Sequence, residues 1–370
     1  MNGTIAEIGN AKLAVPKGTR VIDGKGLHVY PGIIDSSTQV GLSEISSVRE
    51  TSDVSELGDF KPQLRAAVAI NPSSEHIPVI RANGTTTALA VPGGGLIAGQ
   101  ASMMHLDGWT WEDMTVRRDA AMVLNFPTLS ASGDRSFADA RRNYDQQIRN
   151  LSAYLESARR YQKAKAAPVP DFRIDLALDA MLPVLEGKVP LLVGAERERA
   201  VRDAIAWADR EKLKIVLFNV RRPGKAMTEI KSRNIPVILG PTQELPLEED
   251  DPYDEAFTVP LEFHKAGVKF AFGTFGNQFA RNLPYQAATA VAFGLPYEEA
   301  LKAITINPAE IFGISAITGS VEKGKWADLI LTDGDPLEVK TQVKRMFIKG
   351  KEVDLDSRHT RLYKKYMARP

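Results

Sequence analysis

Short apolar runs alternate with helix-forming stretches through the middle of the chain, and this rhythm constrains the fold most strongly. We expect buried strands at the apolar runs and helices at 138–166, 197–211 and 225–233 between them. Strands that alternate with helices are typical of a parallel sheet covered by helices. The predicted strands are 32–35, 86–91, 121–125, 190–193, 214–218, 236–239 and 269–272.

These strands predict an α/β fold, a TIM-like (β/α)8 barrel, with the remaining eighth strand expected within 125–185. An open, doubly wound sheet is the alternative. A chain of 370 residues suits a large barrel that carries an accessory module.

Both ends of the chain carry the alternating apolar pattern and turn glycines of antiparallel strands, which predicts a small β-sandwich built from the two ends. The expected strands are 5–8, 20–22, 27–30, 327–332 and 343–348. The predicted segments are 1–30 and 318–353 as the two parts of the β-sandwich, 31–317 as the barrel, and 354–370 as a polar, basic tail forming a loose helix or arm.

The composition excludes several classes of function. Lys and Arg number 47 against 46 Asp and Glu, a net charge of +1, so no basic surface for nucleic acid or an anionic membrane is expected. No run approaches the ~18 apolar residues of a membrane-spanning helix. The absence of cysteine rules out disulfides, thiol nucleophiles and cysteine-ligated metals.

Three sequence blocks resemble the amidohydrolase superfamily, most closely its imidazolonepropionase-like branch. They are YPGIIDSSTQVGL at 30–42, ITINPAEIFG at 304–313 and GSVEKGKWADLILTDGDPL at 319–337. In these blocks Gly324 and Gly334 serve turns, Asp328 caps or bridges strands, and Asn307 begins a helix. The blocks therefore predict the fold and are silent on activity.

The resemblance implies a hydrolase of carbon–nitrogen bonds that holds Zn²⁺ or another divalent cation at the strand ends. Its ligands would be histidines after the first barrel strand, a mid-barrel carboxylate or carbamylated lysine, further histidines ending strands 5 and 6, and an Asp ending strand 8. Such a cation lowers the pKa of its bound water to about 7.

At the corresponding positions this chain carries other residue types. Ser37 and Gln39 follow the first barrel strand, Gly194 ends strand 5, and Phe275 stands in place of the strand-8 Asp. The end of strand 6, at 218–220, offers Phe, Asn and Val instead of a histidine. We therefore expect no bound metal or other cofactor and no intact catalytic residue. Asp35 is the candidate for a residual role, although the resemblance makes it an orienting residue.

Other candidate residues have ordinary structural explanations. His105 is the histidine closest to a plausible barrel-top loop, but a lone histidine among apolar residues more often packs or makes a local hydrogen bond. The glycine-rich run 91–100 could cradle an anion or could simply form a flexible turn. Trp109 and Trp111 favour a core or subunit interface over a ligand cage, and Glu186 and Lys188 favour a solvated position.

The leading hypothesis is an amidohydrolase-fold protein without its metal centre, which binds a small molecule at the barrel mouth or acts as a partner subunit. A homo-oligomer or a complex with an intact paralogue is expected. The alternative is a hydrolase of cyclic amides that retains activity. A third hypothesis is a structural protein whose mouth is closed by Phe275.

The chain has no signal-peptide pattern, and 3–9 looks like a strand that relatives precede with further strands. We therefore expect the natural start to lie upstream, which leaves the compartment open.

Overall fold

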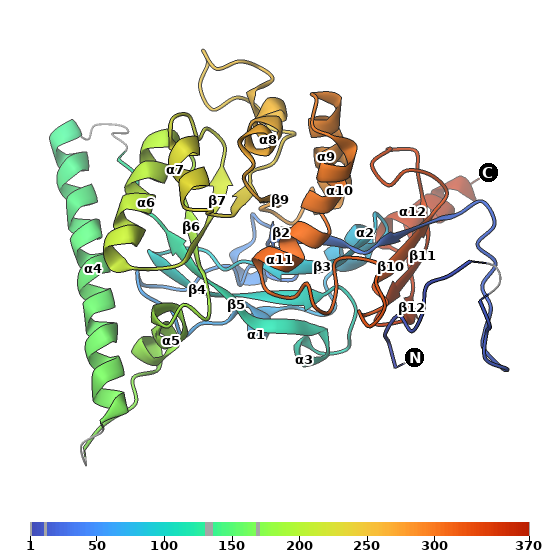
Figure 1. The fold of residues 1–370 in the computed structure, drawn as a ribbon, viewed down its shortest axis with the longest axis horizontal. Helices are drawn as coiled ribbons and strands as arrows, with labels where there is room; N and C mark the ends of the chain where they lie inside the picture. The colour runs from blue at the N-terminus through green and yellow to red at the C-terminus, as the bar shows by residue number, and fades with distance from the viewer. Residues whose placement is uncertain (1, 11–12, 130–135, 168–170, 370) are drawn as a thin grey trace.

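The computed structural model describes residues 2–10, 13–129, 136–167 and 171–369. Eight strands follow one another around a nearly closed barrel, in the order β2-β3-β4-β5-β6-β7-β8-β9 (Figure 1). This confirms the predicted fold, a barrel with a small β domain made from both chain ends. The barrel strands are β2 Ile33–Thr38, β3 Thr85–Ala90, β4 Ile97–His105, β5 Thr115–Asn125, β6 Leu191–Gly194, β7 Ile215–Val220, β8 Val237–Leu239 and β9 Phe270–Phe272.

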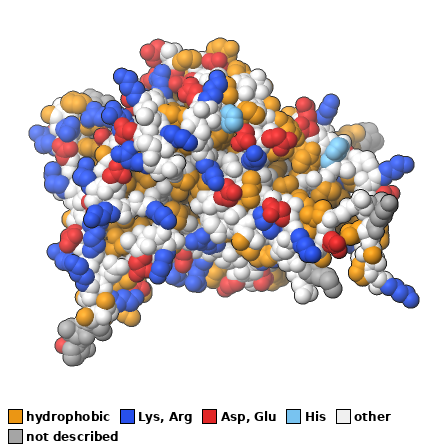
Figure 2. Space-filling model, in the orientation of Figure 1, with side chains coloured by type: hydrophobic (Ala, Val, Ile, Leu, Met, Phe, Trp, Pro, Cys, Tyr) orange, Lys and Arg blue, Asp and Glu red, His pale blue; other side chains and the backbone are white. Residues whose placement is uncertain are grey.

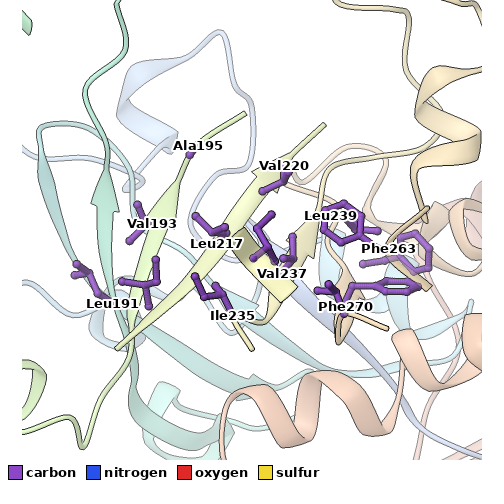
Figure 3. Packing of buried hydrophobic residues seen from close by; sticks show 14 of the residues in the cluster. Leu191, Val193, Ala195, Leu217, Val220, Ile235, Val237, Leu239, Phe263 and Phe270 are labelled. Carbon is purple, nitrogen blue, oxygen red and sulfur yellow. The ribbon is translucent and has the colours of Figure 1, made fainter. Parts of the chain in front are cut away.

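The barrel wall has two apolar faces because successive strand residues point to opposite sides. In β6, Leu192 belongs to the cluster that fills the barrel, whereas Leu191 and Val193 belong to the cluster between strands and helices. Figure 3 shows part of this outer cluster, with Leu191, Leu217 and Val237 along neighbouring strands. Burial on both faces explains why these strands read as continuous apolar runs.

Helices cover the outside of the barrel. The longest, α4, stands along one edge of the molecule, at the left of Figure 1, and α12 lies at the opposite edge beside the terminal sheet. The helices are α1 Ala66–Ala69, α2 His76–Arg81, α3 Trp111–Met114, α4 Phe137–Ala166, α5 Leu176–Leu185, α6 Glu198–Glu211, α7 Ala226–Ser232, α8 Glu255–Ala266, α9 Leu283–Ala292, α10 Tyr297–Ala303, α11 Ile306–Ile311 and α12 Arg358–Met367.

The eighth strand was predicted in the wrong place. It is β4, which runs antiparallel to both β3 and β5, so the barrel is mixed rather than wholly parallel. The interval 125–185 instead contains α4 and α5; 130–135 and 168–170 within it lie outside the described residues. The glycine-rich run 91–100 is only partly a loop, because Ile97–Gln100 already belongs to β4.

The terminal segments form one antiparallel sheet, in the order β1-β10-β11-β12, with bounds β1 His28–Pro31, β10 Leu329–Thr332, β11 Val343–Ile348 and β12 Lys351–Val353. The expected strands at 5–8 and 20–22 are not formed, and Thr4 makes only an isolated bridge with Trp326. Gly32 carries the chain from β1 into β2, where a β-carbon would lie 2.1 Å from Oγ1 of Thr86.

A buried polar cluster joins the terminal sheet to the barrel. Nε2 of His105 lies 3.2 Å from Oδ2 of Asp328, which also accepts a hydrogen bond from Oγ1 of Thr318 at 2.7 Å. The Lys349 amide donates to Oδ1 at 2.8 Å. Burial acts to raise the pKa of Asp328, but these partners outweigh it and hold the pKa below 3.8. Asp328 thus bridges segments that are far apart in the chain.

The position of His105 corrects the sequence prediction. Because β4 is antiparallel, its last residue lies where the parallel strands begin, at the end of the barrel opposite the mouth. His105 therefore has a packing and hydrogen-bonding role, with the ring of Trp326 5.3 Å away.

The surface carries charges of both signs. Figure 2 shows acidic and basic side chains interspersed over the visible face. In the part of the chain that the structure describes, no helix combines the length and apolar character needed to cross a membrane.

Replacing Asp328 should destabilise the junction between sheet and barrel. In the Asp328→Ala variant, His105, Thr318 and the Lys349 amide lose a shared buried acceptor, so we expect the free energy of unfolding to fall by about 3 kcal/mol. Urea unfolding measures the change. Asp250→Ala, at an exposed loop carboxylate, is the control and should be near neutral; equal effects of the two substitutions would contradict this role.

Candidate functional site

The mouth of the barrel lies at the carboxyl ends of the parallel strands, where barrels of this kind place their ligand loops. Two segments meet there at the seam between the first and last strands: the end of β2 with Gln39, and residues 273–276 after β9. Three of the four predicted positions, Ser37, Gln39 and Phe275, therefore belong to one local structure.

A buried carboxyl group lies at the centre of this seam. Oδ1 of Asp35 accepts hydrogen bonds from the amides of Ser37 and Thr274, each at 3.1 Å, and Oδ2 accepts one from Oγ1 of Thr274 at 2.5 Å. Asp35 is 1% exposed. Burial raises its pKa from 3.8 to about 7, although the hydrogen bonds act to lower it.

The backbone completes the closure. The carbonyl of Ser37 accepts from the amides of Thr274 at 3.0 Å and Phe275 at 2.7 Å. Across the same seam, Oγ1 of Thr38 donates to the Gly276 carbonyl at 2.7 Å, and the Gln39 amide donates to the same carbonyl at 3.2 Å. Ser37 and Gln39 thus contribute main-chain groups that hold β2 against the loop after β9.

Two stacked aromatic rings, one of them on the seam residue Phe275, pack in the mouth. The rings of Phe218 and Phe275 are nearly parallel, at 2°, with centroids 5.9 Å apart. A β-carbon added to Gly194 would lie 3.1 Å from the Phe218 ring, so the ring occupies the space that a larger side chain would need. Phe275 has φ of 57°, a left-handed conformation that costs a bulky residue free energy.

The structure brings most of the predicted site positions together, but their side chains do not form a set of metal ligands. Among the residues that the structure describes, no group of three or more His, Cys, Asp or Glu side chains is placed to hold a metal ion. Glu186 and Lys188 form an ion pair with each other at 2.7 Å, away from the mouth. Trp109 is 90% exposed, and Trp111 packs beside a buried cluster that includes Met104 and Met114.

Sequence reasoning missed two features of the mouth. Thr274 is the main partner of Asp35, and the only signal for it was its place between Gly273 and Phe275. Lys61 is a buried lysine, 3% exposed, whose Nζ donates to the Glu56 carbonyl at 2.6 Å. Burial lowers the pKa of Lys61. No motif marks it, because burial depends on the loop folding over it.

The glycine-rich run packs closely against the loop at 54–59. The Gly93 amide donates to the Val54 carbonyl at 2.7 Å, and a β-carbon on Gly95 would lie 2.5 Å from the Gly58 carbonyl oxygen. The close approach of the two backbones therefore explains why residue 95 is a glycine.

The raised pKa of Asp35 predicts a pH-dependent stability. A folded-state pKa near 7 against 3.8 unfolded means that the folded protein binds the proton more tightly. The resulting stabilisation is complete below pH 4 and is lost as pH rises through 7, a change of about 4 kcal/mol. Urea unfolding at pH 4.5, 6 and 8 should show wild type losing stability relative to Asp35→Asn. A constant difference between the two would refute the raised pKa.

The left-handed conformation of Phe275 predicts an unusual order of stability. Phe275→Gly should be about 1 kcal/mol more stable than Phe275→Ala, because both lose the ring but glycine alone tolerates φ of 57°. Phe218 has no positive φ and is the matched control. At this position Phe218→Ala should therefore be more stable than Phe218→Gly. Thermal unfolding of the four variants measures this, and the same order at both positions would contradict strain at Phe275.

Part of the chain is similar in sequence to known amidohydrolases. The model for the amidohydrolase family matches residues 227–353. The amidohydrolase tasK of Hapsidospora irregularis is 22% identical over 390 residues, which cover 94% of this chain but 39% of that protein. An imidazolonepropionase of Sphingopyxis alaskensis is 47% identical over 51 residues, 14% of this chain and 13% of that protein. The chain thus spans well under half the length of these curated relatives.

Among solved structures, an amidohydrolase from Thermotoga maritima MSB8 has the same fold. Its TM-score is 0.84 at 24% sequence identity, with 96% of this chain and 94% of that chain covered. The chain therefore has the amidohydrolase fold, and its segment 227–353 matches the model of that family.

Proposed function

We propose that this protein has lost the metal centre of its family, and with it ordinary hydrolysis, and that it acts as a ligand-binding or partner subunit. The chemistry of the donor set supports this. Ser37, Gln39, Gly194 and Phe275 offer a hydroxyl, an amide, no side chain and a hydrocarbon ring. Zn²⁺ and related cations need several converging imidazole and carboxylate donors.

The state of Asp35 is the observation that carries the proposal. Both of its oxygens already accept hydrogen bonds across the barrel seam, and burial favours the neutral carboxylic acid. A metal ligand must be deprotonated, so the neutral acid that burial favours is a poor one. The residues present therefore do not fit a metal.

The binding role is supported by the apolar character of the mouth. Phe275 is only partly buried and, with Phe218, presents aromatic surface where catalytic side chains would otherwise stand. A small molecule with an apolar or aromatic group suits such a surface. The partner subunit would be a second copy of this chain or an intact chain of the same fold, which would supply any hydrolysis.

Metal analysis of the purified protein tests the proposal. After incubation with Zn²⁺, Mn²⁺ or Fe²⁺ and removal of excess, elemental analysis should find well under one ion per chain, with the same value in Asp35→Asn. A stoichiometric ion that is retained by wild type and lost in Asp35→Asn would sink the proposal. The exposed Asp250→Asn variant controls for nonspecific loss of charge.

A retained hydrolase activity toward cyclic amides is the second candidate, and the pKa of Asp35 near 7 favours it. A carboxyl group that titrates near neutral pH could act as a general acid or base without a metal. This candidate requires turnover of lactam or imidazolone substrates that resists chelator and falls in Asp35→Asn. Turnover abolished by chelator would instead indicate a metal and contradict both candidates.

A further inference from the structure

A separate cavity of about 480 Å³ lies at the end of the barrel opposite the mouth. It is bounded by the residues that lead into β6, β7 and β8 and by Phe312 and Gly313, which follow α11. Its volume falls within the range of small-molecule sites, roughly 300–1,000 Å³. The cavity shares no residue with the seam around Asp35.

The inner wall of this cavity is apolar. Val216 and Phe312, both buried, belong to the cluster that fills the barrel, and Ile235 belongs to the outer cluster. Leu213 and Ile311 are further lining residues. A ligand that enters the cavity would therefore meet hydrocarbon at its inner end.

The rim is cationic. Four basic side chains line the cavity against two carboxylates, and both carboxylates are already paired. Asp209 pairs with Arg233 at 2.7 Å, and Glu310 pairs with Lys269, which lies outside the lining. The lining cations are Arg117, Lys188, Lys214 and Arg233.

Two of these cations have no carboxylate partner within the described part of the chain. Lys214 makes no ion pair there, and Arg117 donates to main-chain carbonyls, from Nη1 to Phe312 at 2.7 Å and from Nη2 to Lys188 at 3.5 Å. A β-carbon on Gly313 would lie 2.5 Å from Nη1, so glycine lets the guanidinium lie against the chain. Arg117 is thus held in place while its charge stays unneutralised.

We propose that this cavity binds a small organic anion with an apolar body. Arg117 and Lys214 pair with the carboxylate or phosphate group at the rim, and Val216 and Phe312 receive the apolar part. A guanidinium held by carbonyls loses little further freedom when it binds an anion. Neutral molecules would leave the rim charges without a partner, and cations would be repelled.

Calorimetric titration of the full chain tests this site, with hexanoate and phenyl phosphate as probes and hexanamide as the uncharged analogue of hexanoate. We expect both anions to bind and compete with each other, and hexanamide to bind at least tenfold more weakly. Competition shows that one site accepts both anion types; binding of only one probe would restrict the site to that anion. Chelator treatment should change nothing, so the result is independent of the metal content of the mouth.

The decisive variant is Lys214→Met, which removes an exposed charge and breaks no hydrogen bond of the described structure. It should weaken anion binding at least tenfold, and Arg117→Lys should weaken it while keeping the charge. Lys225→Met, at another exposed lysine that does not line the cavity, is the matched control and should bind as wild type does. Equal binding by wild type and Lys214→Met, or no binding of either anion by wild type, would overturn the proposal.

Discussion

The Asp35 carboxyl group closes the barrel. The regular strand ladder runs from β2 around to β9, and between these two strands the connection depends on the carboxyl, the Thr274 side chain and a few main-chain hydrogen bonds. The two Thr274 donors reach Asp35 across 239 residues of sequence. A short seam of this kind sets the relation of the first strand to the last, and with it the width of the whole ring.

The same seam determines the character of the mouth. The carbonyl of Ser37 holds the Phe275 amide, and this fixes the residue in a left-handed conformation with its ring over Phe218. Strain at one residue persists only when its surroundings over-determine it. The polar seam and the aromatic stack therefore act as one unit. The seam constrains the backbone of Phe275, and the stacked rings fill the mouth beside it.

The periodicity of the sequence was enough to predict the parallel strands, because burial on both faces leaves an uninterrupted apolar signature, and it located the helices α4, α6 and α7. It failed for β4, which follows a glycine-rich loop and itself contains Gly99 and polar residues. Because the direction of that strand was not predicted, the position of His105 was wrong as well. The positions around the mouth could be located by motif. Their contacts could not, since Asp35 and Thr274 meet only through the closure of the ring, and no local pattern encodes a pairing at that separation.

The reversed direction of β4 has a consequence for how new chemistry could arise on this barrel. Side chains that project from the last residue of a strand can be varied together with the loop that follows, which is how such barrels diversify. At β4 it is instead the first residue of the strand, Ile97, that lies at the mouth of the barrel, where it forms a bridge with Phe60. An engineer who wished to install a ligand there would have to redesign the entry to a strand and the segment beside it, rather than a loop that follows the end of a strand.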